Sequence, residues 1–451
     1  MAFEIDKQLI ERIESLIENK DNKAIRNLLN EEHHADIAEV LDDLDFDEYI
    51  YIIKLLDSEK TSEILMELDE DIREKILENL SAKEIAKEVG EMDTDDAADI
   101  IGELPQERQE RVINALKDQD LAADIKELLS YKDDSAGSLM AKELVKVFET
   151  WTVAGCLRRI RGQAKEVSRV HSIYVVDKKN RLIGRLSLKD LIVAKNDQKI
   201  ADIYISSVDS VNVNEGVEEV AKIMSKYDLE AIPVVDDHNI LLGRITIDDI
   251  VDVLKDEADK DYQLAAGISQ GVEADDSIWQ LTKARLPWLI LGLFGGLGSV
   301  FIMEGYEEVM SNPMYRSLFF FTPLIAAMAG NVGVQSSAII VQGIANDNVK
   351  GSLFNRLLKE IGLSLINGFV LGILVIIAGF AMGMALDFSI TIAVSMMSVI
   401  VVAALVGTFV PIILDKRGID PAIATGPFIT TSNDIFGIFL FFFIAKLVLG
   451  F

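Results

Sequence analysis

The sequence is poor in cysteine, in histidine and in basic residues. Its 451 residues include 1 cysteine and 4 histidines, and 44 Lys and Arg face 74 Asp and Glu, a formal net charge of −30. The lone cysteine, Cys156, excludes internal disulfides and is typical of a reducing compartment. So large an excess of carboxylates repels phosphate backbones and attracts cations, which excludes nucleic-acid binding.

The sequence also lacks the patterns that carry enzyme chemistry. It contains no recognisable nucleophile–base pair and no glycine-rich phosphate loop, so we expect no enzymatic activity. Its first residues mix charges such as Glu4, Asp6 and Lys7 with apolar positions, and we therefore expect no cleavable signal peptide.

Charge is absent from long stretches of the last third, while the first 281 residues carry the whole net charge of −30. About 20 apolar residues cross a bilayer as a helix, so the last third predicts five transmembrane helices. Only the last stretch contains a charge, Asp434. The predicted spans cover residues 286–303, 317–346, 361–386, 388–414 and 421–445.

The flanking charges predict the orientation of these spans. With the N-terminus in the cytosol, the outer loops hold one basic residue, Arg316, and the other loop cations are cytosolic. We therefore expect a multi-pass protein of the cell (inner) membrane, with a cytoplasmic N-terminus and an extracytoplasmic C-terminus.

The first 130 residues repeat with a period of 24. Leu44-Asp45, Leu68-Asp69 and Met92-Asp93 superpose at this step, and apolar residues recur between them at helical spacing. The pattern predicts an acidic α-solenoid. Its acidic face either binds a partner or is simply solvated.

A second repeat, with period 59, lies within residues 138–255. Residues 173–190 return as 232–249, and each copy predicts two strands followed by a helix, with a further helix before them. The pattern resembles a tandem CBS domain, an α/β sensor module. By that resemblance a twofold Gly-x-x-Ser/Thr-x-x-Asp motif would bind an adenine nucleotide such as ATP; the alternative is helix capping. The candidate residues are Ser187, Asp190, Thr246 and Asp249.

An acidic segment connects this module to the membrane part. Asp249, Asp252, Asp256 and Asp259 step by three and four, which puts like charges along one face of a helix. A bound cation or a basic partner would relieve their repulsion, and a solvated linker helix is the alternative.

In order and content nearly the whole chain resembles the MgtE magnesium channels. The most specific matches are GNVGVQS at residues 330–336 and DPAIATGPFITTSND at residues 420–434. The resemblance implies a homodimer with an acidic N domain (1–130), tandem CBS domains (131–255), an acidic connecting helix (256–280) and a five-helix pore domain (281–451).

Asp434 is the candidate pore carboxylate. It is the only carboxylate deep inside a predicted span, and a lipid-facing charge there is unfavourable by several kcal/mol, so we expect it to face a wet pathway. Counted along the predicted spans, Asn331 and Asp434 both come near the midplane. The membrane part contains no Cys or His, and oxygen ligands favour hard cations such as Mg2+. A structurally paired Asp or a proton relay are the alternatives.

The resemblance further implies that acidic residues of the cytosolic part bind regulatory Mg2+. Val334, Lys255 and Lys260 depart from the family pattern and leave the number and affinity of these ions open. The candidate ligands there are Asp95, Asp99, Glu218, Asp228, Asp249, Asp252, Glu257 and Asp261, and Asp420, before the fifth span, is a further candidate metal ligand.

Three functions are therefore considered. The first is a Mg2+ uptake channel closed by cytosolic Mg2+, with ATP as a candidate regulator. The second is an ion-coupled divalent cation transporter or exporter, which would prefer more ionisable residues in its spans. The third is a membrane-tethered CBS nucleotide sensor.

Overall fold

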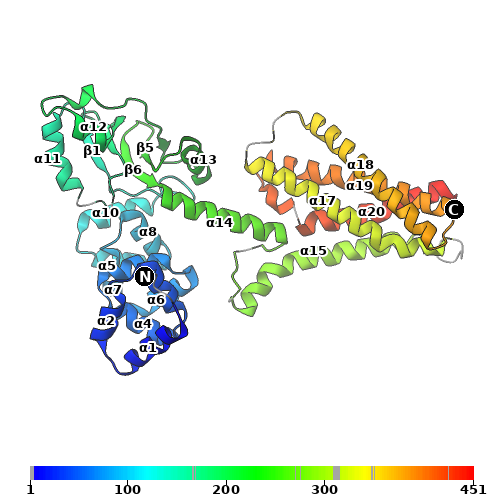
Figure 1. The fold of residues 1–451 in the computed structure, drawn as a ribbon, viewed down its shortest axis with the longest axis horizontal. Helices are drawn as coiled ribbons and strands as arrows, with labels where there is room; N and C mark the ends of the chain where they lie inside the picture. The colour runs from blue at the N-terminus through cyan, green and yellow to red at the C-terminus, as the bar shows by residue number, and fades with distance from the viewer. Residues whose placement is uncertain are drawn as a thin grey trace. The chain divides into compact units, whose positions relative to one another are not determined.

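The structure is a computed structural model that describes residues 5–164, 167, 169–269, 271–274, 276–307, 315–346, 349, 351–424 and 426–450. It divides into two compact units, Met1–Leu254 and Lys255–Phe451. Figure 1 shows the first unit in blue to green and the second in green to red. We call the first the cytosolic unit, after the side of the membrane on which the sequence predicts it to lie, and the second the membrane unit.

The first part of the cytosolic unit is a stack of short helices. Helix α3 packs on α5, α5 on α7, α7 on α9, and α8 on α10. Two helices therefore make one repeat, and the expected solenoid is confirmed. Asp45, Asp69 and Asp93 stand at the N-caps of α4, α6 and α8, which explains the 24-residue step. The helices are α1 (Lys7–Glu18), α2 (Asn22–Leu29), α3 (His34–Asp42), α4 (Phe46–Leu55), α5 (Ser58–Glu67), α6 (Glu70–Asn79), α7 (Ala82–Val89), α8 (Thr94–Gly102), α9 (Gln106–Ala115) and α10 (Gln119–Leu128).

Two three-stranded sheets follow, one for each copy of the 59-residue repeat. In each sheet the first strand runs parallel and the third antiparallel to the central strand, β1-β2-β3 and β4-β5-β6. The copies pair through their turns, where Leu182 N donates to Asn239 O at 2.9 Å and Leu241 N to Asn180 O at 3.0 Å. The elements are β1 (Val145–Phe148), α11 (Val153–Gln163), β2 (Ile173–Val176), β3 (Leu182–Leu186), α12 (Leu188–Val193), η1 (Ile200–Asp202), β4 (Val211–Asn212), α13 (Val217–Tyr227), β5 (Ala231–Val235) and β6 (Leu241–Thr246).

The connecting helix is α14 (Ile247–Ala266), and its bounds differ from the expected 256–280. It begins directly after β6, where Thr246 N donates to Asp249 Oδ2 at 3.1 Å and so satisfies a backbone N–H at the helix start. It ends before Gly267, whose φ of +81° lies in the left-handed region that terminates helices. The acidic segment therefore belongs to the last CBS helix and not to a separate one.

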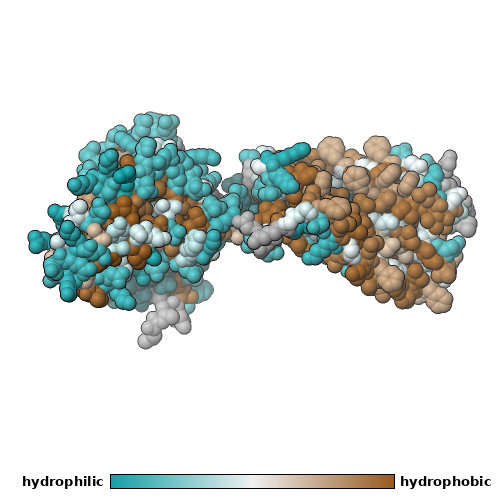
Figure 2. All heavy atoms as spheres, turned by 90° about the horizontal axis from the view of Figure 1, so that it is seen from above, coloured by the Kyte–Doolittle hydropathy of each residue, from teal (hydrophilic) through white to brown (hydrophobic). Residues whose placement is uncertain are grey.

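The membrane unit contains five described helices long and apolar enough to cross a bilayer. Figure 2 shows hydrophobic atoms over much of its surface, whereas hydrophilic atoms dominate the cytosolic unit. The first and third helices begin eight residues before the predicted spans, at Ile278 and Leu353. The third also stops early, at Ala381, before Gly383 with φ +73°, and the fifth begins late, at Gly426, after a separate 3-10 turn. The elements are α15 (Ile278–Glu304), η2 (Arg316–Phe321), α17 (Thr322–Ala345), α18 (Leu353–Ala381), α19 (Leu386–Asp415), η3 (Pro421–Ala424) and α20 (Gly426–Leu449).

Helix α19 lies at the centre of this unit and packs against α17, α18 and α20. Helix α20 packs in addition against α15 and α17. The segment that carries Asp434 is thus held by three other helices.

Candidate ion-binding sites

Asp434 and Asn331 lie on the two facing helices α20 and α17. Asp434 comes eight residues after Gly426, the start of α20, which is a rise of about 12 Å along a 24-residue helix. Because η3 is separate from α20, Asp434 is the ninth residue of this helix, and its depth near the bilayer midplane stays a prediction. Asn331 comes nine residues after Thr322, near the middle of α17, and its side chain is exposed in this chain.

Glycines on α17 bring it close to Asp434. A methyl group on Gly330 would lie 3.6 Å from Asp434 Oδ1 and 3.1 Å from Thr430 Cγ2. Oδ1 of Asp434 is buried and has no hydrogen-bond partner among the described residues. An unpaired buried carboxylate oxygen is unfavourable, so this position favours a ligand, a cation or water, over a purely structural role.

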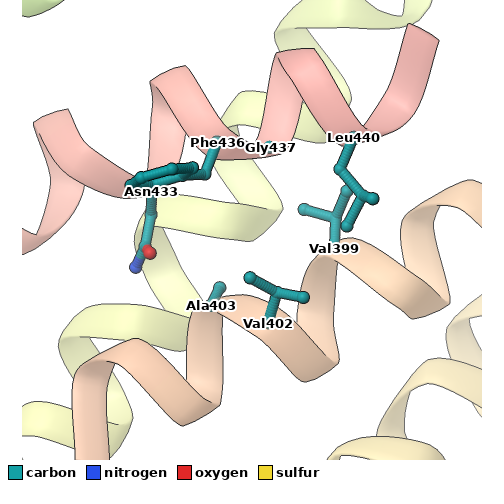
Figure 3. A pocket seen from close by; sticks show the side chains of 7 residues that line it. All are labelled: Val399, Val402, Ala403, Asn433, Phe436, Gly437 and Leu440. Atoms are coloured by element: carbon teal, nitrogen blue, oxygen red, sulfur yellow. The ribbon is translucent and has the colours of Figure 1, made fainter. Parts of the chain in front are cut away.

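Asn433, directly before Asp434, was not identified from the sequence. Its side chain is 1 % exposed, and neither its Oδ1 nor its Nδ2 has a described partner. A methyl group on Gly333 would lie 1.8 Å from this Nδ2, so only glycine leaves room for the amide against α17. Figure 3 shows the amide beside α19, at the edge of a crevice too narrow for a water molecule. The crevice is lined by Val399, Val402, Ala403, Asn433, Phe436, Gly437 and Leu440.

The end of α14 lies against the start of α20. A methyl group on Gly267 would come within 2.3 Å of Pro427 Cγ, and one on Gly426 within 2.1 Å of Ala265 O. These glycines therefore let the connecting helix touch the first turn of the helix that carries Asp434. Asp420, a candidate ligand nearby in sequence, is exposed and its Oδ1 accepts a hydrogen bond from Ala422 N at 2.8 Å.

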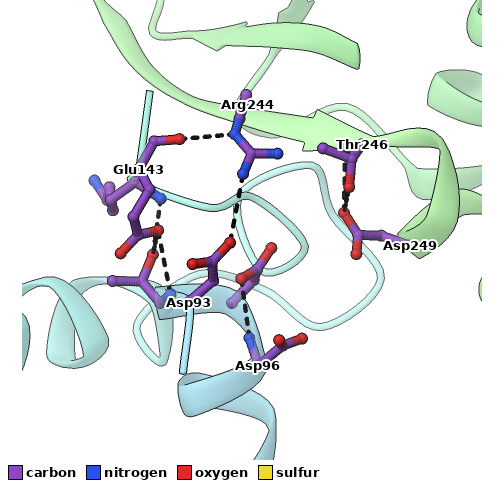
Figure 4. Close-up of polar contacts among 9 residues, drawn as sticks. Asp93, Asp96, Glu143, Arg244, Thr246 and Asp249 are labelled. Atoms are coloured by element: carbon purple, nitrogen blue, oxygen red, sulfur yellow. Dashed lines mark hydrogen bonds and ion pairs between the residues drawn. The ribbon is translucent and has the colours of Figure 1, made fainter. Parts of the chain in front are cut away.

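A second group of carboxylates gathers in the cytosolic unit around the start of α8. One carboxylate oxygen from each of Asp93, Asp95 and Glu143 lies within 4.8 Å of the others, a spacing suited to a metal ion. Only Asp95 among these three was selected from the sequence. We call Asp93, Asp95, Asp96, Glu143 and Asp249 the α8 acidic cluster; Figure 4 shows much of it.

Hydrogen bonds hold the α8 acidic cluster in place. Glu143 Oε2 accepts from Thr94 N at 3.2 Å and from Thr94 Oγ1 at 2.8 Å. Arg244, buried on β6, donates from Nε to Glu143 O at 2.7 Å, and its Nη2 lies 3.5 Å from Asp93 Oδ2. One buried arginine thus ties the second CBS copy to the N domain, and a single cation leaves most of the negative charge uncompensated.

Burial and nearby negative charges raise the pKa values of three aspartates in this cluster, Asp95, Asp96 and Asp249. Burial is the first cause for Asp95, whose pKa is well above its usual range, followed by the charges of Asp96, Asp249 and Asp93. Burial, then Asp249 and Asp93, raises the pKa of Asp96 to about 7. Burial also raises the pKa of Asp249, although hydrogen bonds from Thr246 oppose the rise. The cluster is therefore poised to bind protons or a cation.

Of the other candidate ligands, Asp99 lies closest to this cluster, one turn further along α8. Burial raises the pKa of Asp99 to about 6, with Arg73 opposing the rise and the charge of Asp249 adding to it. Asp252 is exposed on α14. Glu218, in the first turn of α13, and Asp228, its left-handed C-cap, are both exposed, and no described contact joins them to Asp95.

The last two candidates lie further along α14. Glu257 Oε1 is 3.8 Å from Lys260 Nζ, so the basic residue that departs from the family pattern offsets part of the charge. Asp261 is half-buried.

The two candidate nucleotide motifs differ in their local bonds. Ser187 Oγ accepts from Lys189 N at 3.2 Å, a helix cap, and Asp190 is exposed on α12. In the second copy, Thr246 Oγ1 donates to Asp249 Oδ2. A local bond therefore engages the hydroxyl in both copies, as a helix cap at Ser187 and as a bond to a carboxylate at Thr246, and of the two aspartates Asp190 is the exposed one.

An acidic helical domain, paired CBS modules and five apolar helices with a carboxylate among them define a membrane transporter of divalent cations. Residues 322–444 match the divalent cation transporter family MgtE, residues 32–134 match the MgtE intracellular N domain, and residues 136–197 and 200–256 match the CBS domain.

The chain is 31% identical over 450 residues to the magnesium transporter MgtE of Thermus thermophilus, covering 99% of each chain. It is 39% identical to that of Enterococcus faecalis over 72% of this chain and 71% of the relative. The chain belongs to the MgtE family of magnesium transporters.

Two solved structures resemble the cytosolic unit. One is the soluble part of a magnesium transporter, with a TM-score of 0.51, 31% identity and coverage of 56% of this chain and 99% of the other. The other is the cytosolic domain of the Mg2+ channel MgtE in complex with ATP, with a TM-score of 0.51, 34% identity and coverage of 54% and 99%.

Proposed function

We propose that this chain forms a homodimeric, Mg2+-selective uptake channel that cytosolic Mg2+ closes. The proposal is supported by the buried Oδ1 of Asp434, which lies beside Gly330 in the membrane unit and has no hydrogen-bond partner among the described residues. Two copies of the chain would contribute two such carboxylates, which together neutralise one divalent cation. Because Mg2+ dehydrates reluctantly, we propose that the ion passes Asp434 with much of its hydration shell, with Asn331 as a further oxygen ligand.

The α8 acidic cluster supplies the gate. Without a cation, repulsion among Asp95, Asp96 and Asp249 opposes the packing of α8 against the second CBS copy. Mg2+ bound between these carboxylates removes the repulsion and favours the packed state. Mg2+ bound at the other candidate ligands would likewise favour the packed state. These are Asp99, Glu218, Asp228, Asp252, Glu257, Asp261 and Asp420.

Helix α14 connects this gate to the pore. Asp249 lies in its first turn, and its last residues contact Gly426 and Pro427 at the start of α20. We propose that movement of the first turn is carried along this continuous helix to the base of the helix that holds Asp434. The expected effect is closure of the pore when cytosolic Mg2+ is high.

The free energy of several weak ions is sufficient for such a gate. A site at ten times its dissociation constant contributes about 1.4 kcal/mol to the state that binds it. Four such ions would supply roughly 6 kcal/mol, enough to convert a mostly open population into a mostly closed one. Each site can therefore be weak, with a dissociation constant near the millimolar range, and the gate still works.

We also propose ATP as a regulator that binds the CBS module. A relative's cytosolic domain has been solved in complex with ATP, and the exposed Asp190 is suited to accept hydrogen bonds from ribose hydroxyls. Because Asp249 is occupied by Thr246 and by the α8 acidic cluster, the first copy is the preferred site.

Flux into proteoliposomes tests the channel against an ion-coupled exporter. The purified chain is reconstituted, and Mg2+ currents are recorded while Mg2+ is varied on the side of the N-terminus, which the positive-inside rule assigns to the cytosol. A channel gives a reversal potential that follows the Mg2+ gradient and a current that falls as cytosolic Mg2+ rises. A reversal potential that follows a proton or sodium gradient would favour the exporter.

A further inference from the structure

Two neighbouring residues of α20, Asn433 and Asp434, hold buried polar atoms without a hydrogen-bond partner among the described residues. These atoms are Oδ1 and Nδ2 of Asn433 and Oδ1 of Asp434. The proposed function assigns Asp434 to the ion and gives Asn433 no part. A buried amide that makes no hydrogen bond is unfavourable, so the position of Asn433 requires an explanation of its own.

In the packing that the structure describes, nothing from outside can reach this amide. Asn433 is 1 % exposed, and the chain itself covers both of its amide atoms. A lipid, an ion or a second copy of the chain would therefore have to displace a helix before it touched the amide. Water is excluded as well, because the crevice beside Asn433 is too narrow for a water molecule (Figure 3).

Glycines of α17 lie directly against this polar pair. A methyl group on Gly333 would lie 1.8 Å from Asn433 Nδ2, and one on Gly330 would lie 3.6 Å from Asp434 Oδ1. The two glycines are three residues apart, so they lie on one face of α17. Because glycine has no side chain to fill the contact, a modest separation of α20 from α17 would leave room for water at both polar residues.

Helix α19 closes the other side of the amide with apolar groups. Its residues in the crevice are Val399, Val402 and Ala403. None of their side chains offers a hydrogen bond to Asn433. A change in helix packing that admits water would satisfy the amide, whereas the described packing leaves it dry.

We infer that the crevice between α19 and α20 fills with water when the transporter conducts, and that Asn433 then lines the wet pathway beside Asp434. This inference rests on the proposed channel function. The amide oxygen accepts hydrogen bonds from water, including the water molecules that a hydrated Mg2+ keeps. Each amide atom that gains a partner favours the wet packing by roughly tenfold.

Cysteine accessibility in the full chain tests whether the crevice opens. Cys156→Ala removes the buried thiol of the lone cysteine, and Asn433→Cys or Ala403→Cys is added to that background. In proteoliposomes, a charged methanethiosulfonate reagent should modify both crevice variants at least about tenfold faster without Mg2+ than with high Mg2+ on both faces of the bilayer. The matched control is Ala404→Cys, at a buried position of α19 that does not line the crevice and should stay unmodified.

A further variant tests the amide itself. Asn433→Leu nearly keeps the volume of the side chain and removes its polar atoms, so the dry packing becomes more favourable. Mg2+ flux at low cytosolic Mg2+ should fall by about tenfold. The Mg2+ concentration that gives half-maximal flux should not change, because Asp434 is intact. Asn433→Ser keeps a donor and an acceptor and should restore most of the flux. Asn367→Leu makes the same change at an exposed position of α18 and should leave flux unchanged.

The outcomes separate this inference from the proposed gate. Normal flux through Asn433→Leu would overturn the inference, and so would the absence of any modification of both crevice variants under either condition. Equal modification of Ala404→Cys would also overturn it, because the whole bundle would then be loosening. Modification of the crevice variants at one rate with and without Mg2+ would support the wet crevice and contradict closure by cytosolic Mg2+.

Discussion

The two units of this transporter hold carboxylates in opposite ways. In the membrane unit, Asp434 lies on α20, and its buried Oδ1 is beside Gly330 of α17 with no hydrogen-bond partner in the described part of the chain. In the cytosolic unit, Asp93, Asp95, Asp96 and Asp249 crowd around the start of α8, where burial and the charges of Asp93 and Asp249 raise the pKa values of Asp95 and Asp96. No neighbouring carboxylate can take over the role of Asp434, whereas several carboxylates of the α8 acidic cluster can bind the same ion. Loss of Asp434 should therefore abolish Mg2+ transport. Loss of any one carboxylate of the cluster should only shift the Mg2+ concentration at which the pore closes.

The largest effect is expected for Asp434→Asn. The amide keeps the shape of the side chain but removes the charge that a divalent cation requires, so Mg2+ flux should fall by at least about 100-fold in a folded protein. Flux into proteoliposomes, measured with a Mg2+-sensitive dye, gives the result. Asp387→Asn, which neutralises an exposed carboxylate at the start of α19, is the matched control and should leave flux unchanged. Normal flux through Asp434→Asn would refute its place in the pore.

A smaller effect is expected when the gate is neutralised. The triple variant that combines Asp249→Asn, Asp252→Asn and Glu257→Gln loses several bridging ligands at once. Its current should therefore respond less steeply to cytosolic Mg2+. Each single change should move the Mg2+ midpoint by roughly two- to fivefold, as expected for one weak site among several.

The control for this gate carries the same change in charge at another place. The control combines Glu74→Gln, Glu78→Gln and Glu110→Gln. These three glutamates are exposed on α6 and α9, outside the α8 acidic cluster. This triple variant should keep a steep response to Mg2+. If both triple variants behave alike, the response depends on net charge and the proposed gate is wrong.

The two copies of the CBS module carry the same motif in different surroundings, and we expect their aspartates to contribute unequally to ATP binding. Asp190→Ala should weaken ATP binding by about tenfold, as lost hydrogen bonds to ribose would. Asp249→Ala should weaken it by less than about threefold, because that carboxylate already bonds Thr246. Calorimetry on the full chain measures both, with the exposed Asp197→Ala as the control. No heat at millimolar ATP would leave both motifs with their capping role.

The smallest effect is a release of protons. Asp96, with a pKa raised to about 7, is partly protonated at neutral pH when no cation is bound. Because the packed state raises this pKa, protons favour packing, and that stabilisation is lost as the pH rises through 7. Mg2+ added at pH 7 should therefore release up to about half a proton from this group.

Calorimetry in two buffers of different ionisation enthalpy measures this proton release. Asp96→Asn should lower it, while the exposed Glu91→Gln, just before α8, should not. Equal release from the unchanged chain and from Asp96→Asn would show that the cluster does not couple Mg2+ to protons.

The architecture was predictable from the sequence because its signals are local. The two repeats, with periods of 24 and 59 residues, and the five uncharged runs can each be recognised from residues that are near in the chain or that recur regularly. The exceptions were boundaries at which capping decides: α14 begins at Ile247 because Asp249 bonds Thr246, and the third span stops before Gly383.

The identity of the lone pore candidate was also contained in the sequence, because a single charge in an apolar run needs no partner to be noticed. What only the tertiary structure decided was which residues meet. Arg244 and Asp93 are separated by 151 positions, and Glu143 reaches Thr94 across 49. No local pattern marks such pairs, since they arise when α8 packs against the second CBS copy. Asn433 is a residue of the same kind: its burial depends on Gly333 of another helix, and only the packed helices reveal that its amide has no described partner.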